Sequence, residues 1–171
     1  MIEACKGSDY LVHTASPFLT QKGVFSGKVK NVKKDLIDPA VNGTISVLKG
    51  CAKYKVKKCV ITSSSATMFY KKDPKIVNFG PQSWSDEEAC DPYTLSKLLA
   101  DKAVWKFMKM LPEERRFRVS TIHPGLAMGP TFTKTSFESQ QIMCNVMNGT
   151  FKFLRIDIPM CDVRDVAEAH V

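Results

Sequence analysis

Short apolar runs and helically spaced apolar positions alternate along the chain. The short runs lie at residues 10–15, 59–62 and 118–123, and their length is typical of buried parallel strands. Apolar positions with a period of about 3.6 residues lie between them, at residues 38–54 and 92–110. Because strands and helices alternate in this order, the chain is predicted to have an α/β fold with a parallel sheet.

Capping residues indicate where the two helices start. Asp38 and Asp91 each precede a proline, so each carboxylate can accept the backbone amides of a first helical turn. Further along, we expect a helix at 136–147 and the start of another at 162–171. The remaining segments are predicted as a helix end at 1–6 before Gly7, loops at 18–34 and 68–90, and extended pieces around Phe151 and Met160.

Polar side chains gather where the predicted strands end. His13 and Thr14 lie at the end of the first strand, Thr62 to Ser65 close the second, and His123 closes the third. Ligands of open parallel sheets bind beyond the carboxyl ends of the strands. The sequence therefore predicts a ligand crevice at this end of the sheet.

Tyr93 and Lys97 lie four residues apart at the start of the helix that follows the serines. This spacing puts the phenol and the ammonium on one helix face. A nearby cation favours the phenolate, so we expect the pKa of Tyr93 to lie below its free value near 10, within reach of proton transfer. An ordinary amphipathic helix can carry the same pair, but the serine cluster just before it favours a chemical role.

The composition is that of a globular domain. Of the 171 residues, 44% are apolar and 25% are charged, so we expect residues 1–171 to form one domain. No run is long enough to span a membrane, and no secretory leader is recognisable. The six cysteines are scattered, which favours reduced thiols and a cytoplasmic protein. The three histidines lack neighbours at ligand spacing, which argues against a metal site.

The net charge of +8 comes largely from two lysine clusters. They comprise Lys28, Lys30, Lys33 and Lys34, then Lys53, Lys55, Lys57 and Lys58. Such clusters can attract nucleic acid or an anionic surface. These two are short and lack the interleaved aromatic residues of single-strand binders, so we expect solvated loops and helix ends and no nucleic-acid partner.

Longer segments of the chain resemble a known superfamily. They read "KGSDYLVHTASPF", "PAVNGTISVLKGC", "CVITSSSATM", "WSDEEACDPYTLSKLLADKAVW", "STIHPGLAMGP" and "DVRDVAEAHV". Together they are similar to the extended short-chain dehydrogenases/reductases of the NAD-dependent epimerase/dehydratase superfamily, and most of all to the dihydroflavonol reductase and cinnamoyl-CoA reductase group. The likeness extends over essentially the whole chain. It implies a Rossmann-like doubly wound sheet, an NADP or NAD cofactor, with NADP favoured, and a small carbonyl substrate.

The resemblance also implies roles for the residues that match the family's motifs. Tyr93 would give its proton to a carbonyl oxygen as hydride arrives from the nicotinamide. Lys97 would lower the pKa of Tyr93 and bond the nicotinamide ribose. Ser64 would polarise the substrate oxygen, with Ser65 as the alternative, because epimerases place their serine next to a pair like Ala66-Thr67. The residues implied to contact the cofactor are His13, Thr14, Ala15, Thr62, Ser63, Tyr93, Lys97, Pro124, Gly125 and Leu126.

The family's nucleotide fingerprint, G-x-x-G-x-x-G after a first strand, is missing from this sequence. The resemblance therefore implies a partial sheet that lacks the first βαβαβ half and its phosphate cradle. We then expect the strand at residues 10–15 to have an open apolar edge, so that the chain alone dimerises through this edge, aggregates or is marginally stable.

Three functions are compatible with this sequence. The first is an NAD(P)-dependent oxidoreductase acting on a carbonyl or secondary alcohol through Ser64, Tyr93 and Lys97, impaired in this chain. The second is a non-catalytic remnant or interaction module. The third is sugar-nucleotide epimerase or dehydratase chemistry, or 3β-hydroxysteroid dehydrogenase chemistry, on the same fold. The segment from Trp84 to Asp86 and the long loop before Tyr93 favour the reductase group, by resemblance.

Overall fold

The computed structural model describes residues 1–17, 30–73, 75, 78–132, 138–150 and 159–171. Within them the chain forms two compact units, Met1–His123 and Pro124–Val171, and each is described by itself. The expectation that residues 1–171 form a single domain stays a prediction.

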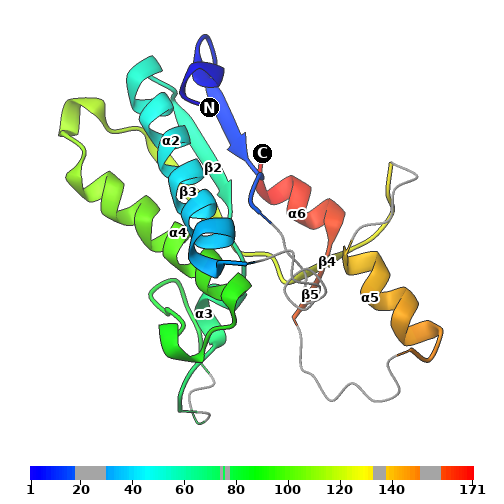
Figure 1. The fold of residues 1–171 in the computed structure, drawn as a ribbon. Helices are drawn as coiled ribbons and strands as arrows, with labels where there is room; N and C mark the ends of the chain where they lie inside the picture. The colour runs from blue at the N-terminus through cyan, green and yellow to red at the C-terminus, as the bar shows by residue number, and fades with distance from the viewer. Residues whose placement is uncertain (18–29, 74, 76–77, 133–137, 151–158) are drawn as a thin grey trace. The chain divides into compact units, whose positions relative to one another are not determined.

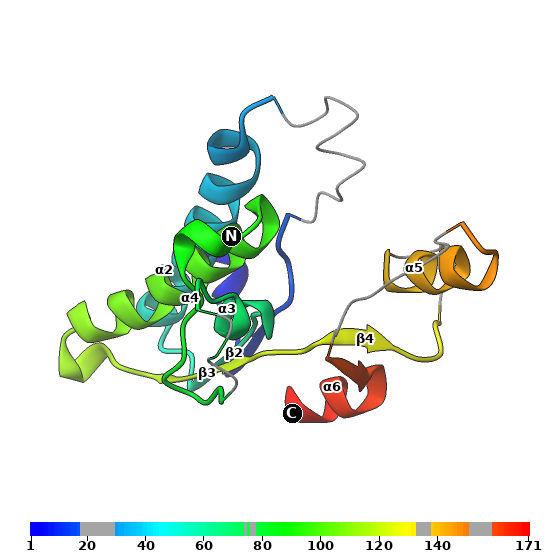
Figure 2. The ribbon, with the colours of Figure 1, turned by 90° about the horizontal axis from the view of Figure 1, so that it is seen from below.

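The first unit is built on a three-stranded parallel sheet. Strands β1 (Tyr10–His13), β2 (Lys58–Thr62) and β3 (Arg118–Ile122) lie in the order β1-β2-β3. The three predicted strands are confirmed, although the first and third end before Ala15 and His123. Because each crossover between parallel strands is right-handed and the strands advance in one direction, α2 (Asp38–Tyr54) and α4 (Pro92–Met110) lie on the same face of the sheet (Figures 1 and 2).

The core lies between the sheet and these two helices. Cys59 and Ile61 of β2 are buried against Val47 and Leu48 of α2 and Val104 of α4. Burying an aliphatic side chain of this size stabilises a fold by about 1.5–3 kcal/mol, so this layer holds α2 and α4 in place. Helix α4 can therefore serve as a rigid support for side chains at its amino end.

The opposite face of β1 is exposed. Tyr10 and Val12 alternate with the inward-facing residues of β1 and are 64% and 51% exposed. The prediction of a buried first strand is thus wrong for these two positions within the described residues. The reason is topological, since both helices cover the other face and β1 pairs only with β2 in the described sheet.

Helical structure begins before α2, at a position that the sequence pattern does not indicate. A π-helical turn, η2 (Lys33–Ile37), leads directly into it, so Asp38 does not cap a helix and the predicted cap is wrong. The carboxylate of Asp35 instead accepts the amides of Lys30 (3.0 Å) and Asn31 (2.9 Å). The physical reason is that Ile37 already has helical dihedral angles, which leaves no amide for Asp38 to cap.

Helix α4 matches its prediction at both ends. Asp91 Oδ1 accepts the amides of Tyr93 (2.9 Å) and Thr94 (3.2 Å), and Pro92 opens the first turn. This cap is worth about 1 kcal/mol and fixes the turn that carries Tyr93. The remaining elements of this unit are short: η1 (Ile2–Cys5), α3 (Ala66–Phe69), η3 (Glu87–Ala89) and η4 (Glu113–Arg115).

The second unit pairs two short parallel strands, β4 (Leu126–Met128) and β5 (Met160–Asp162). Its helices are α5 (Glu138–Met147) and α6 (Val163–Ala169), and Asp162 caps α6 by accepting the amide of Arg164 (2.8 Å). These elements confirm the helix ending at Met147, the extended piece at Met160 and the last helix. Positions 136–137, the piece around Phe151 and most of the loop predicted at 18–34 lie outside the described residues.

No described helix has both the length and the apolar character that crossing a bilayer requires. All six cysteines are free, as expected for reduced thiols.

Candidate active site

The carboxyl end of the three-stranded sheet and the amino end of α4 bring several predicted residues together. Lys97 is 8% exposed, and its ammonium donates to the carbonyl oxygen of Thr62 at the end of β2 (3.1 Å). The phenol of Tyr93 lies one turn earlier on the same helix face. Ser63 and Ser64 follow Thr62 directly, so the candidate serine, phenol and ammonium belong to one end of one unit.

Burial dominates the electrostatics of the Tyr93–Lys97 pair. The pKa of Tyr93 is raised by burial and then by the nearby Asp91 carboxylate, so the phenol keeps its proton at neutral pH. The pKa of Lys97 is lowered by burial, and the Asp101 carboxylate opposes that shift. The expected lowering of the Tyr93 pKa is therefore wrong for this structure, because burial and the Asp91 carboxylate both disfavour the phenolate.

His13 lies in the same buried polar region. It is the last residue of β1 and is 8% exposed. Burial lowers its pKa, and the charge of Lys97 lowers it further. The imidazole is thus held in its neutral form near pH 7. Thr14 and Ala15, which follow it, are exposed.

The two candidate serines differ in their surroundings. Ser64 Oγ accepts the amide of Ala66 (3.2 Å), and the carbonyl of Ser64 accepts both the amide and the hydroxyl of Thr67 (3.0 and 2.8 Å). Ser65 is partly buried, and its hydroxyl has no hydrogen-bond partner within the described part of the chain. The hydroxyl of Ser64 is the better fixed of the two, and the choice between them stays open.

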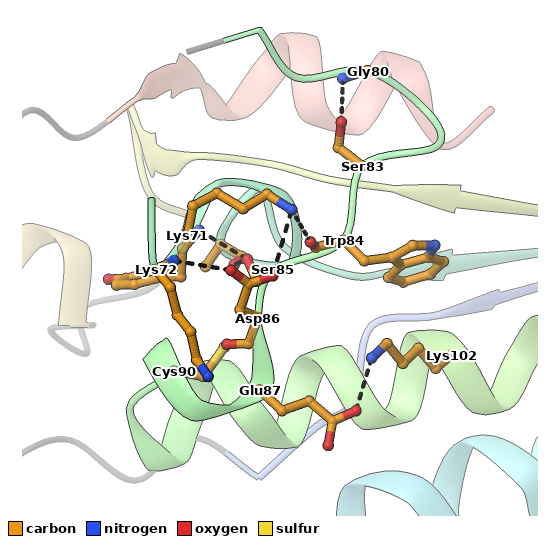
Figure 3. Close-up of polar contacts among 12 residues, drawn as sticks. Lys71, Lys72, Gly80, Ser83, Trp84, Ser85, Asp86, Glu87, Cys90 and Lys102 are labelled. Carbon is orange, nitrogen blue, oxygen red and sulfur yellow. Dashed lines mark hydrogen bonds and ion pairs between the residues drawn. The ribbon is translucent and has the colours of Figure 1, made fainter. Parts of the chain in front are cut away.

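The loop before α4 is tied to the segment after the serines (Figure 3). Ser85, which is 3% exposed, donates to the carbonyl of Ala66 (2.8 Å) and accepts the amide of Tyr70 (2.9 Å). Lys71 donates to the carbonyl of Trp84, and its ammonium lies 3.8 Å from Asp86. A segment predicted only as a loop is therefore held against α3, and sequence reasoning missed Ser85 as the residue that holds it.

Asp101 is a second residue that sequence reasoning missed. Its carboxylate is buried and accepts the hydroxyl of Ser63 (2.5 Å), while His123 Nε2 lies 2.6 Å from the same oxygen. The indole of Trp105 donates to the other oxygen (3.1 Å). Asp101 follows Lys97 by four residues, so the continuation of the Tyr93–Lys97 spacing is the signal that could have found it.

The cavity at this end of the sheet is small. It has a volume of about 20 Å³, and its lining includes His13, Ser63, Lys97 and Asp101. That is room for about one water molecule and excludes a nicotinamide ring, so a cofactor would lie over these residues and not inside the cavity. A groove of about 770 Å³ lies at the other end of the sheet and contains none of the predicted site residues.

Pro124, Gly125 and Leu126 belong to the second unit. Leu126 opens β4, and its amide donates to the carbonyl of Pro159 (2.7 Å). A Cβ on Gly125 would meet that same carbonyl oxygen at 2.1 Å, so glycine is required by the close approach of the two backbones. This gives Gly125 a structural reason that is independent of any cofactor.

Comparison with known proteins agrees with these features. The family model described as 3-beta hydroxysteroid dehydrogenase/isomerase matches residues 1–171. A cinnamoyl-CoA reductase of Medicago truncatula is 34% identical, over 100% of this chain and 50% of that protein. The NADPH-dependent methylglyoxal reductase of Saccharomyces cerevisiae is 33% identical, over 94% of this chain and 51% of that protein.

The fold is also that of a solved relative. The crystal structure of the yeast methylglyoxal/isovaleraldehyde reductase complexed with NADPH matches with a TM-score of 0.74 and 30% identity, over 98% of this chain and 53% of that one. The α/β, Rossmann-like prediction is thereby confirmed, and the chain spans about half the length of the curated relatives it matches. The chain belongs to the 3-beta hydroxysteroid dehydrogenase/isomerase family, within the extended short-chain dehydrogenases/reductases.

Proposed function

We propose that this chain carries the proton-transfer centre of an NADPH-dependent carbonyl reductase. The observation that carries the proposal is Lys97, a buried ammonium anchored to the end of β2 one helical turn from Tyr93. Burying a charge is costly, and a fold that needed only packing at this position would be served by an aliphatic residue. A buried lysine beside a phenol and a serine therefore favours chemistry over packing.

In this proposal Tyr93 is the general acid. Its raised pKa keeps the proton available at neutral pH, and the proton passes from the phenol oxygen to the carbonyl oxygen of the substrate. Ser64, or Ser65 in its place, donates a hydrogen bond to that carbonyl oxygen and polarises it. Lys97 stabilises the phenolate that remains after transfer.

The residues present fit the nicotinamide end of NADPH and not its phosphates. The Lys97 ammonium has three donors and one described acceptor, Thr62, so it can also donate to ribose hydroxyls. Bound NADPH would supply the hydride. His13, Thr14, Ala15, Ser63 and the segment from Pro124 to Leu126 are the remaining proposed cofactor contacts. The glycine fingerprint that would hold the pyrophosphate is not among these 171 residues.

Two relatives named as reductases favour this chemistry over a steroid or sugar-nucleotide substrate. The non-catalytic alternative predicts that no carbonyl compound is turned over and that Lys97 can be replaced with no effect on cofactor binding. The test is a screen of small aldehydes and ketones with NADPH and then NADH, following the loss of reduced nicotinamide. Turnover that disappears in Tyr93→Phe supports the proposal, and turnover that survives in this variant overturns it.

We also propose that copies of the chain associate through β1. The support is the exposure of Tyr10 and Val12 on a strand that pairs only with β2 within the described sheet. Sedimentation of the chain over a range of concentrations tests this proposal, and a monomer at all concentrations would overturn it. A cytoplasmic location stays a prediction.

A further inference from the structure

Helix α4 carries a stripe of polar side chains that continues past the proposed centre. Tyr93, Lys97, Asp101 and Trp105 follow one another at intervals of four residues, so they share one face of the helix. The proposed reaction uses the first two. Asp101 has a fully buried carboxylate and no role in that reaction.

Asp101 binds the residues that follow two strands of the sheet. The hydroxyl of Ser63, the first residue after β2, donates to Oδ2 (2.5 Å). His123 Nε2, at the first residue after β3, lies 2.6 Å from the same oxygen. The amide of Ser63 also donates to the carbonyl of Ile122 (2.7 Å), so the two strand ends are linked to each other as well as to α4.

Asp101 is also the acidic group that faces Lys97. Both residues line the cavity of about 20 Å³ at the carboxyl end of the sheet, where His13 lies opposite them on β1. The groups around Lys97 are the Thr62 carbonyl of β2, the His13 imidazole of β1, and the Tyr93 phenol and Asp101 carboxylate of its own helix. Burial keeps the Tyr93 phenol protonated at neutral pH, so Asp101 is the negatively charged group among them.

We propose that Asp101 is a positioning residue that keeps the buried Lys97 ammonium charged and ties the ends of β2 and β3 to α4. Ser64 follows Ser63 and Pro124 follows His123, and Ser63 and His123 are the two residues that contact Asp101. One buried carboxylate thus sets both the charge beside Tyr93 and the backbone that presents the candidate serine. Its importance for turnover rests on the proposed function, but the coupling to Lys97 does not.

The coupling can be measured without cofactor or substrate. The titration of the Lys97 amine is followed by NMR in the wild-type chain and in Asp101→Asn. Removal of the negative charge leaves burial unopposed, so we expect the pKa of Lys97 to fall by about one pH unit, a ten-fold change in its acid constant. Glu87→Gln is the matched control, because Glu87 pairs with the exposed Lys102 (2.8 Å) and should leave Lys97 unchanged.

Two more variants separate charge from tethering. Asp101→Glu keeps the negative charge, so the pKa of Lys97 should return to its wild-type value. Ser63→Ala keeps the charge of Asp101 but removes the hydrogen bond from the residue 63 side chain. We therefore expect faster hydrogen exchange at the backbone amide of residue 63 and an unchanged pKa of Lys97. If Asp101→Asn does not fold, Asp101→Ser gives the same change in charge in a smaller side chain that can still bond Ser63.

The outcomes are distinct. A Lys97 titration that falls in the neutral variant and recovers in Asp101→Glu supports the proposal. A Lys97 pKa that does not change in Asp101→Asn or Asp101→Ser overturns it, whether or not the chain binds NADPH. Failure to bind NADPH together with an intact Lys97–Asp101 coupling would count against the proposed function alone.

Discussion

The two ends of the three-stranded sheet differ in the exposure of their charged side chains. At the amino end, the groove of about 770 Å³ is lined by Lys49, Lys53, Lys55, Lys57, Arg115 and Arg116 beside apolar residues such as Phe107 and Phe117. Its ion pairs, Lys53–Glu3 (2.8 Å) and Lys57–Asp9 (3.0 Å), are mostly exposed. At the carboxyl end, few charges are present, and Lys97 and Asp101 are buried.

The proposed function assigns chemistry to the end whose charged side chains are buried, and not to the end with more charge or the larger groove. Exposed ion pairs are screened by water and contribute little, and lysines near helix ends stabilise the helix dipole. A buried ammonium and carboxylate persist only where each is paired and hydrogen-bonded. The larger groove, at the amino end, is therefore the poorer candidate for an active site.

The largest expected effect is on turnover at the carboxyl end. Tyr93→Phe removes the proposed proton donor and keeps the ring, so kcat for carbonyl reduction should fall by about 10²–10⁴ with NADPH affinity nearly unchanged. The matched control is Tyr54→Phe, because Tyr54 bonds Glu3 (2.5 Å) near the amino end and should leave kcat unchanged. Equal losses in the two variants would contradict the assignment of the acid.

The next effect is on stability. Asp101→Ala leaves the buried Ser63 and the partly exposed His123 and Trp105 without their shared acceptor. Leaving the buried Ser63 hydroxyl unsatisfied and removing the other two bonds costs about 1–3 kcal/mol, which urea unfolding would measure. Lys53→Ala at the amino end should leave the urea midpoint unchanged. A midpoint that shifts equally in both variants would remove the distinction between the two ends.

A smaller effect is expected on association. Val12→Lys places a charge on the exposed face of β1 and should shift the sedimentation profile toward the monomer, since charged residues on edge strands oppose pairing. Val146→Lys on α5, a residue that is 40% exposed, is the control for added charge. Association that persists in Val12→Lys would place the contact elsewhere.

The smallest effect is on pH dependence. The pKa of His13 is lowered from its ordinary value of 6.5, so the unfolded chain binds more protons than the folded chain as the pH falls through that value. The free energy of unfolding should therefore decrease between about pH 8 and about pH 5, and less steeply in His13→Gln. Parallel curves of unfolding free energy against pH for the wild type and His13→Gln would show that folding does not hold His13 neutral.

Sequence reasoning succeeded where several local signals agree. The bounds of α4 follow from a cap at Asp91, a proline at the first position and a sustained apolar period, and each acts within a few residues. The parallel order of the strands follows from the alternation of strands and helices. The prediction of the start of α2 failed because the π-helical turn before Asp38 has no sequence signal comparable to a cap.

The electrostatics of the site could not be predicted, because they depend on burial. Spacing places Lys97 and Tyr93 on one helix face, but it does not reveal that Lys97 donates to the carbonyl of Thr62. Spacing also does not reveal that Tyr93 is buried near the Asp91 carboxylate, and these two effects raise its pKa, so the predicted direction was wrong. Asp101 meets Ser63 and His123 only after β2, β3 and α4 have packed, and no local pattern connects these three segments.

The most direct test of the account is a titration of the chain with NADPH, followed by nicotinamide fluorescence, in three forms. They are wild type, Lys97→Ala, and a Lys55→Ala/Arg115→Ala variant of the amino-end groove. Because the groove is basic and NADPH is an anion, the second variant detects binding at the wrong end. The account predicts saturable binding that is lost in Lys97→Ala and retained in the groove variant. Binding that depends on the groove and not on Lys97, or no binding in wild type, would contradict it.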